Sequence, residues 1–457
     1  MGVSDYFSDE EIKTLDKCIT YASGRRMIVS KITREHEHNW QTVETPHRVC
    51  REMLGLIPED AENFVIFFAL EFLEVLVKEL EFDGGRVVFI ADNELEANVA
   101  TVLYGVKSVV YSKQEVSGIA IKELLEDTGM KFGKVAVVGN PPYQQQSEAQ
   151  KNRKTEGGKQ QAKPIYHLFV ESVIDYINPN YFSFIIPSRW MVGGMGLGSF
   201  RERMMNDRRI KKIVHFSGTR EIFENVAIAG GVNYFLWQKN YNGECEFVND
   251  GDSIKRNLND YDIILQDNKA ISILYKVQDN CSKFINQRTI VNKPFGLPTN
   301  YSSWTNSGTK CISKERKVRF VVSDFTDKHG ILNKWKVCTN QSTVEGASFI
   351  GKEKAFFSRN GIFIIEPGTI CTETYIVINV FDTKCEAENF VAYMKTKFFR
   401  FMLGLRVVTQ HINKEKFAWV PDLEDYSKPW TDEELYRKFG LTENDIRYVE
   451  SKIKPIV

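Results

Sequence analysis

Short apolar runs alternate with longer amphipathic segments through the first half of the chain. Each run is followed by residues whose apolar positions recur with helical spacing, which is typical of strands and helices in alternation. After a first run that begins at residue 63, strands are predicted at residues 86–92, 107–111, 135–139, 181–187, 210–216 and 229–239. Helices are predicted at residues 9–30, 47–56, from the end of the first run to about residue 80, 93–103, 115–127 and 163–177. This order predicts an α/β protein with a doubly wound, mainly parallel sheet.

The pattern changes after residue 243, where polar turns and short elements replace the alternation. The elements predicted there are strands at residues 317–322 and 361–365, helices at 269–278 and 386–405, and a helix that is capped by Thr431. We therefore predict a first domain over residues 1–243. A mixed α+β second domain with a helical tail is predicted over residues 244–457.

Composition narrows the class of protein. The 457-residue chain has a formal net charge of zero, which argues against binding nucleic acid through bulk charge alone but allows a local basic cleft. Its eight cysteines form no C-x-x-C pair and no zinc spacing, so reduced thiols and no metal site are expected. The sequence shows neither a signal-peptide pattern nor an apolar run of roughly 20 residues. We therefore expect a cytoplasmic protein that does not enter a membrane.

The most informative stretch is Val135-Ala-Val-Val-Gly-Asn-Pro-Pro-Tyr143, where an apolar strand ends abruptly at a glycine and two prolines. In open α/β sheets, ligands bind beyond the carboxyl ends of the strands. The Asn140 side-chain oxygen and the Pro141 carbonyl are two acceptors that can hold one exocyclic amino group of a base. Tyr143 offers a ring for stacking, and the rigid Pro141-Pro142 pair fixes the spacing. The alternative is a proline-stiffened strand exit without chemistry.

Asn140-Pro141-Pro142-Tyr143 after an apolar strand resembles the catalytic motif of the amino-directed DNA methyltransferases, above all the adenine-N6 group of restriction–modification systems. The resemblance extends to residues 41–56, 164–190 and 210–239. It implies a Rossmann-like methyltransferase domain, a target-recognition domain, double-stranded DNA as substrate and S-adenosylmethionine as methyl donor. The four motif residues would then be catalytic, acting on N6 of a flipped adenine. A restriction or methyltransferase subunit is the partner that such a system implies.

The resemblance also assigns a donor site. Thr45-Pro46 before a helix, and Asp92 or Glu94 after the second strand, match donor-contacting positions of the family, although an acidic helix cap is the alternative for the two acids. The family's glycine loop is replaced here by Phe67-Phe-Ala-Leu-Glu71, in which Glu71 is a further donor-site candidate. The missing glycines support a second hypothesis, a catalytically degenerate methyltransferase-like DNA-binding or partner subunit. A third hypothesis keeps the pocket but changes the donor or the modified base.

Basic and aromatic side chains supply the predicted DNA contacts. The polar loop at residues 144–163 carries cations suited to phosphates, although a plain surface loop is the alternative. Phe223 is a candidate to stack on the flipped base or a core residue, and the basic helix near residue 395 either contacts DNA or is simply solvated. The full predicted set is Arg153, Lys154, Arg189, Trp190, Phe223, Lys395, Lys397 and Arg406.

Overall fold

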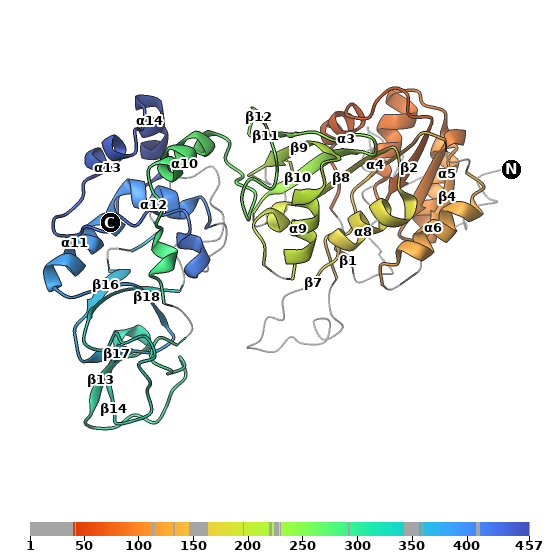
Figure 1. Ribbon diagram of the computed structural model, residues 1–457. Coiled ribbons are helices and arrows are strands. Elements are labelled where there is room, and N and C mark those ends of the chain that lie inside the picture. Colours follow the sequence, from red (N-terminus) through yellow and green to blue (C-terminus); the bar gives the residue numbers. More distant parts are fainter. Residues whose placement is uncertain are drawn as a thin grey trace, which may run out of the picture. The chain divides into compact units, whose positions relative to one another are not determined.

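The computed structural model describes residues 40–41, 43–111, 113, 115–130, 133–145, 163–194, 196–218, 222–223, 228, 230–290, 293–341, 356–358, 360–407 and 412–456. The chain forms two compact units that divide between Gln266 and Asp267 (Figure 1). The domain boundary predicted after residue 243 therefore lies too early, because two further strands join the sheet of the first unit. The helix predicted at residues 9–30 falls outside the described residues.

A mostly parallel sheet forms the centre of the first unit. Its described strands are β2 (Asn63–Phe67), β3 (Val87–Ala91), β4 (Lys107–Val110), β5 (Val135–Gly139), β8 (Tyr181–Pro187), β9 (Ile210–Phe216), β10 (Val232–Gln238), β11 (Cys245–Asn249) and β12 (Asp252–Arg256). Their order across the sheet is β4-β3-β2-β5-β8-β10-β9-β11-β12. The strands from β4 to β8 pair in parallel, whereas β10 is antiparallel to both β8 and β9. This arrangement confirms the predicted doubly wound, Rossmann-like sheet and the antiparallel hairpin of β9 and β10.

The direction of winding reverses between β2 and β5. From β2 the chain moves outward through β3 to β4, and it then returns to the opposite side of β2 to form β5 and β8. Such a switch point leaves a crevice at the carboxyl ends of the two strands, where doubly wound sheets bind their ligands. Phe68 and Asn140 are the residues that follow β2 and β5, so the predicted motif stands at this switch point.

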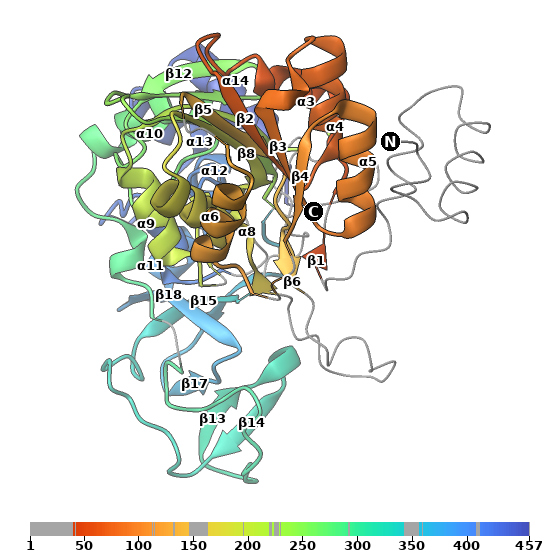
Figure 2. The ribbon, with the colours of Figure 1, turned by 90° about the vertical axis from the view of Figure 1, so that its right-hand side faces the viewer.

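Helices cover both faces of this sheet. They are α3 (His47–Leu54), α4 (Leu70–Leu73) with its continuation η2 (Glu74–Glu79), α5 (Glu94–Tyr104), α6 (Gly118–Asp127), α8 (Tyr166–Ser172) with its continuation η4 (Val173–Ile177), and α9 (Gly198–Asn206), with the short turns η3 (Gly84–Arg86) and η5 (Ser188–Met191). In β2, Phe64 and Ile66 face a core shared with α3, α4 and α5, whereas Val65 and Phe67 face a core shared with α6, α8 and α9. Figure 2 shows the two layers of helices with the strands between them.

The local sequence explains where α5 begins and ends. The Asn93 side chain accepts a hydrogen bond from the backbone N–H of Glu96, and so caps the first turn. Gly105 follows the last turn in the left-handed conformation, with φ of 67°, which glycine adopts without steric cost. Both ends confirm the helix predicted at residues 93–103 to within a residue.

Within the described residues of the first unit, five short strands were not predicted. Strand β11 buries alternate residues and β12 buries only Arg256, so both lack the continuous apolar run that marks the central strands. β1 (Trp40–Gln41), β6 (Gln144–Gln145) and β7 (Lys163–Pro164) form a separate small sheet in the order β1-β6-β7. The pairing of β6 with β7 holds the two ends of the predicted polar loop together, while its residues 146–162 lie outside the described part of the chain.

The second unit contains two small sheets and a group of helices. Its described elements are α10 (Lys269–Asp279), η7 (Ile285–Gln287), β13 (Thr309–Ile312), η8 (Lys314–Arg316), β14 (Val318–Val321), β15 (Trp335–Asn340), β16 (Ile362–Ile365), β17 (Thr369–Cys371), β18 (Tyr375–Phe381), α11 (Lys384–Lys395), α12 (Lys397–Gly404), η9 (Lys414–Phe417), α13 (Asp432–Lys438) and α14 (Glu443–Lys452). The strands pair in the orders β14-β13-β17 and β16-β15-β18. The single helix predicted at residues 386–405 is two helices, because Thr396 has an extended ψ of 152° and caps α12 with its side chain.

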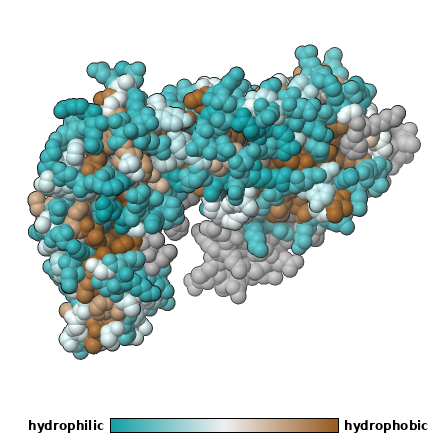
Figure 3. All heavy atoms as spheres, viewed as in Figure 1, coloured by the Kyte–Doolittle hydropathy of each residue, from teal (hydrophilic) through white to brown (hydrophobic). Residues whose placement is uncertain are grey.

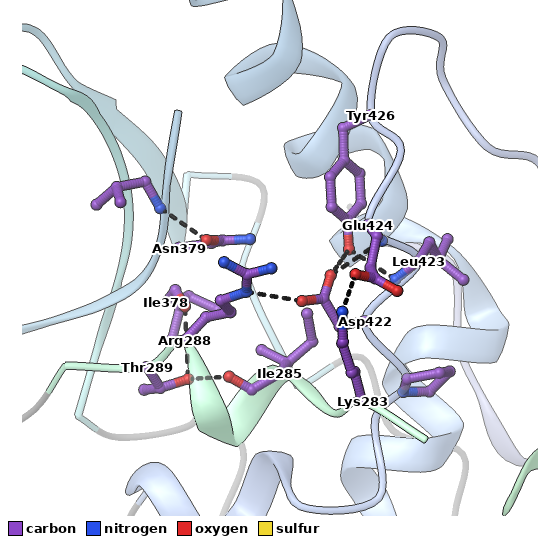
Figure 4. A network of polar contacts seen from close by, with 12 residues as sticks. Lys283, Ile285, Arg288, Thr289, Ile378, Asn379, Asp422, Leu423, Glu424 and Tyr426 are labelled. Atoms are coloured by element: carbon purple, nitrogen blue, oxygen red, sulfur yellow. Dashed lines mark hydrogen bonds and ion pairs between the residues drawn. The ribbon is translucent and has the colours of Figure 1, made fainter. Parts of the chain in front are cut away.

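A polar network ties the C-terminal segment to the rest of the second unit (Figure 4). The buried Asp422 carboxylate accepts hydrogen bonds from Arg288 Nε and from the Tyr426 hydroxyl, both at 2.9 Å. The Asp422 backbone N–H donates to the Lys283 carbonyl at 2.8 Å. Since a buried carboxylate is costly without such partners, this network anchors residues 422–426 beside η7.

The face of the described residues seen in Figure 3 is mainly hydrophilic, with separate apolar patches. The exposed large apolar side chains of the first unit belong to different elements and include Leu80, Ile119 and Tyr176. Apolar residues scattered in this way are ordinary on a globular surface. Within the described ranges, the helices lack the combination of length and apolar character that crossing a bilayer requires.

The close approach of β5 to β2 gives a test of the fold. A Cβ atom added at Gly139 would lie 2.5 Å from the Phe67 carbonyl oxygen and 2.8 Å from Phe67 Cβ. We expect Gly139→Ala to lower the free energy of unfolding by about 1–3 kcal/mol, as overpacking of a core does, measured by urea denaturation. Gly198→Ala is the matched control, because nothing lies within 4 Å of the added methyl group. Equal stability of the two variants would contradict the predicted contact.

Candidate active site

Asn140 stands directly after β5, where its backbone N–H donates to the Phe67 carbonyl across the switch point at 3.2 Å. Its side-chain Nδ2 donates to the Val43 carbonyl at 2.7 Å and to Thr45 Oγ1 at 3.0 Å. A carbonyl oxygen can only accept, so the Val43 contact fixes which end of the amide faces it. The other end, Oδ1, is buried and has no hydrogen-bond partner among the described residues. The fold therefore presents one oriented acceptor at the end of β5.

Tyr143 completes the same turn. Its side chain is 3% exposed, as is that of Asn140. Burial raises the pKa of the Tyr143 hydroxyl, and the neighbouring Asn140 amide opposes this shift. The hydroxyl makes no hydrogen bond to any described residue, while the Tyr143 carbonyl accepts the N–H of Ile165 at 3.1 Å, just before α8. One turn thus holds an amide and a phenol that each have an unused polar atom.

Further unused polar atoms come from α8 and η5, next to the end of β8. They are the Tyr166 hydroxyl, Arg189 Nε and Trp190 Nε1, which have no hydrogen-bond partner within the described ranges. Burial raises the pKa of Tyr166, and the nearby Arg189 guanidinium opposes that shift. Because β8 pairs with β5, these groups follow the strand beside the one that carries Asn140. Buried polar groups without partners are rare in folded proteins, so their concentration here indicates a site for a polar ligand.

A group of carboxylates lies on the other side of the switch point. Asp92 and Glu96 are 2% and 4% exposed, and Glu96 Oε2 accepts the backbone N–H of Asp92 at 2.9 Å. Burial raises the pKa of Glu96 to about 8, and the negative charges of Asp92 and Glu71 add to the shift. Burial likewise raises the pKa of Glu71 to about 8, opposed by the backbone of the fully buried Thr45. These three acids and Thr45 form the carboxylate cluster.

The structure brings together three of the donor-site residues that the sequence predicts, namely Thr45, Glu71 and Asp92. Glu94 is exposed on the first turn of α5 and lies outside this group, while Pro46 precedes α3 with φ of −58°. Sequence reasoning missed Glu96, although its place four residues after Asp92 puts both near the same end of α5. Ionised carboxylates only accept hydrogen bonds, so the cluster suits a ligand with hydroxyl donors and positive charge.

The predicted DNA contacts of the first unit have different environments. Arg189 is half-buried beside the unused Trp190 and Tyr166 atoms, so it stands at the candidate site. Trp190 is fully buried, and its ring packs edge-on against Phe200 with centroids 5.8 Å apart. Phe223 is 3% exposed and belongs to the core on the α3 face, which favours the core alternative over stacking on a base. Arg153 and Lys154 lie outside the described residues.

Two of the three predicted contacts in the second unit are held within the protein. Lys397 forms an ion pair with Glu450, and the Arg406 guanidinium lies 4.5 Å from the centroid of the Trp419 ring at 3% exposure. These two cations stabilise the packing of α12, so we correct their assignment as phosphate contacts. Lys395 is exposed at the end of α11 and remains the basic candidate of this helix pair.

Comparison with known proteins places the Asn140 side of the site in a family. Residues 107–223 match the model of the Eco57I restriction-modification methylase family. This segment is therefore similar to the restriction-modification methylases. It contains β5, the Asn140–Tyr143 turn and η5, whereas Thr45, Glu71 and Asp92 precede it. The match therefore covers the Asn140–Tyr143 turn and not the carboxylate cluster.

Individual relatives cover parts of the chain. A protein of Mycoplasma pneumoniae described as an uncharacterized adenine-specific methylase is 34% identical over 139 residues, which is 28% of this chain and 31% of that protein. The chain thus spans about a third of the length of this curated relative. The type I restriction-modification methyltransferase subunit of Streptococcus thermophilus aligns with a TM-score of 0.34 and 15% identity, covering 50% of this chain and 53% of that chain. The type IIL restriction-modification enzyme MmeI, solved in complex with DNA, aligns with a TM-score of 0.44 and 11% identity, covering 100% of this chain and 75% of that chain.

The raised pKa of Glu96 predicts how stability depends on pH. Between about pH 4.5, the ordinary value of a glutamate, and about pH 8, the folded protein holds a proton that the unfolded chain releases. Stability must therefore fall as pH rises through this window, by up to about 1.4 kcal/mol per pH unit for one carboxyl group.

We expect Glu96→Gln to remove this part of the slope and to be the more stable protein above pH 8, measured by urea denaturation at several pH values. Glu94→Gln, a neutralised exposed neighbour on the same helix, should keep the slope of the wild type. Parallel curves for Glu96→Gln and the wild type would contradict the expectation.

Proposed function

We propose that this protein is a site-specific DNA methyltransferase that transfers a methyl group from S-adenosylmethionine to N6 of a flipped adenine. The observation that carries the proposal is the oriented, unpaired Oδ1 of Asn140, held at the switch point of a Rossmann-like sheet. The family match over residues 107–223 supports the same chemistry, because it contains this turn.

The target amine must be held by two hydrogen-bond acceptors, and its nitrogen must stay open to the incoming methyl group. Adenine N6 has two N–H donors, which would be accepted by Asn140 Oδ1 and by the Pro141 carbonyl. Both bonds hold the amine so that its nitrogen lone pair is directed toward the donor, and catalysis is then mainly by positioning. Pro142 keeps the spacing rigid, and the Tyr143 ring stacks on the base. Inside a duplex this amine is not accessible, so the adenine leaves the base stack before it reacts.

The carboxylate cluster fits the donor in its chemistry. Asp92 would accept from ribose hydroxyls, and the charges of Glu71 and Glu96 would balance the positive charges of the donor. Thr45 joins the two halves of the site, since its hydroxyl accepts from Asn140 while its backbone lies against Glu71. When bound, S-adenosylmethionine supplies a methyl group that is activated by the adjacent sulfonium.

The proposal also assigns roles in DNA binding to the second unit and to Arg189. The second unit would choose the DNA sequence, with the exposed Lys395 at a phosphate, and Arg189 would meet the nucleotide at the crevice. Double-stranded DNA is the substrate, and a restriction or methyltransferase subunit is the expected partner. A cytoplasmic location is part of the proposal, and the DNA substrate and the free cysteines of the described residues support it.

The Asn140 acceptor gives the direct test of function. We expect Asn140→Ala to lose about 100-fold or more in kcat, because one of two acceptors for the amine is removed, while DNA affinity stays within about threefold. Labelled donor and a mixture of genomic DNAs would be incubated with each protein, and nucleosides would be quantified by mass spectrometry. Asn240→Ala, at an exposed turn after β10, is the control and should form N6-methyladenine at the wild-type rate. Activity of Asn140→Ala equal to that of the control would refute the mechanism.

Thr45 gives a test of how the amide is oriented. Thr45→Val keeps the size of the side chain but removes the hydroxyl that accepts from Asn140 Nδ2 at 3.0 Å. We expect kcat to fall roughly tenfold because the amide loses one of its two anchors, with the KM for DNA unchanged. Thr45→Ser retains the hydroxyl and should restore most of kcat. An unchanged kcat in Thr45→Val, or a loss in kcat that Thr45→Ser shares, would show that the hydroxyl has no such role.

A further inference from the structure

Phe68 has an unusual backbone for a bulky residue. It directly follows β2 with φ of 56°, in the left-handed region that glycine adopts freely and that other side chains rarely enter. Its backbone N–H donates to the Ile90 carbonyl at 2.9 Å, and its side chain is 7% exposed. Backbone strain of this kind persists only where surrounding contacts hold it, and it gathers at functional sites.

Aromatic side chains from two other elements hold the Phe68 ring. Its centroid lies 5.3 Å from that of Phe169 on α8 and 6.4 Å from that of Tyr111, which follows β4, and both contacts are edge-to-face. Tyr111 and Phe169 are themselves in contact, with centroids 6.3 Å apart. The Phe68 ring therefore fills a space whose walls are two aromatic rings.

The space lies beside the position assigned to the ribose of the donor. Asp92 follows β3 directly. The last two residues of β3 accept backbone hydrogen bonds from Tyr111 and from Phe68. The Tyr111 N–H donates to the Ala91 carbonyl at 2.9 Å, and the Phe68 N–H donates to the Ile90 carbonyl. A purine attached to a ribose at Asp92 would thus meet the rings of Tyr111 and Phe169. Aromatic rings are the side chains on which a purine stacks best.

We propose that Phe68 occupies the space of the donor's adenine ring, so that S-adenosylmethionine binds only after the Phe68 side chain leaves the contact with Tyr111 and Phe169. This inference rests on the proposed function, because it takes the carboxylate cluster as the donor site. It also accounts for a bulky residue at the position where the family resemblance leads us to expect a glycine loop. The measured donor affinity would then be reduced by the fraction of molecules in which the ring is displaced.

Removal of the ring should tighten donor binding. We expect Phe68→Ala and Phe68→Asn to lower the Kd for S-adenosylmethionine at least tenfold, measured by titration calorimetry on the full-length protein. Phe68→Asn is included because asparagine tolerates the left-handed conformation, so this variant folds even where alanine does not. Adenosine is a second probe and should gain affinity in the same variants, since it carries the ring without the methionine part. Phe82→Ala, which removes a partly buried ring from the opposite core, should leave both values within twofold of the wild type.

The outcomes separate this proposal from the proposed function. If donor affinity is unchanged or weaker in both folded Phe68 variants while N6-methyladenine is still formed, the role of Phe68 is refuted and the function stands. If the variants bind the donor more tightly but no variant or wild-type protein methylates DNA, the role of Phe68 is supported and the function fails. If no protein binds the donor and none methylates DNA, both are refuted.

Discussion

The hydrogen bond from Asn140 Nδ2 to the Val43 carbonyl is the interaction on which the candidate site depends. An amide has two ends of similar shape, and only the oxygen can accept from a target amine. The Val43 carbonyl cannot donate, so it selects the end that turns toward the protein and leaves Oδ1 for a ligand. The residue that sets this orientation comes from a segment 97 positions earlier in the chain, and it acts through its backbone.

The switch point between β2 and β5 explains why the Asn140–Tyr143 turn and the carboxylate cluster lie close together. The segment before α3 carries Thr45, and helices α4 and α5 carry Glu71 and Glu96. Tyr166 and Arg189 come from α8 and η5, which are connected to β8 on the other side of β5. Residues from the helix layers on the two faces of the sheet can meet at one site where neighbouring strands end and their connections leave toward opposite faces. Gly139 matters for the same reason, because a side chain there would push β5 away from Phe67.

The sequence predicted those parts of the structure whose signals are local. Continuous apolar runs located the buried strands, and the Asn140–Tyr143 motif located the switch point. Strands β11 and β12 were not predicted, because strands buried on one side show only a weak alternation of apolar and polar residues, which resembles a loop. The assignments of Lys397 and Arg406 failed because their ion pair and ring contact depend on Glu450 and Trp419, which no local pattern connects to α12. The role of Val43 has no sequence signal at all, since every residue has a carbonyl.

Two energetically unfavourable features at the carboxyl edge of the sheet, the buried acids and the Phe68 backbone, would be relieved by the same ligand. Glu71 and Glu96 have raised pKa values because burial and nearby negative charges disfavour their ionised forms, and Phe68 is held in a left-handed conformation. A cation bound beside the acids would let them ionise, and an aromatic ring between Tyr111 and Phe169 would let Phe68 relax. A ligand that combines positive charge with a purine removes both costs at once. S-adenosylmethionine, the donor proposed above, is a ligand of this kind, so one molecule would satisfy both the acids and the aromatic rings.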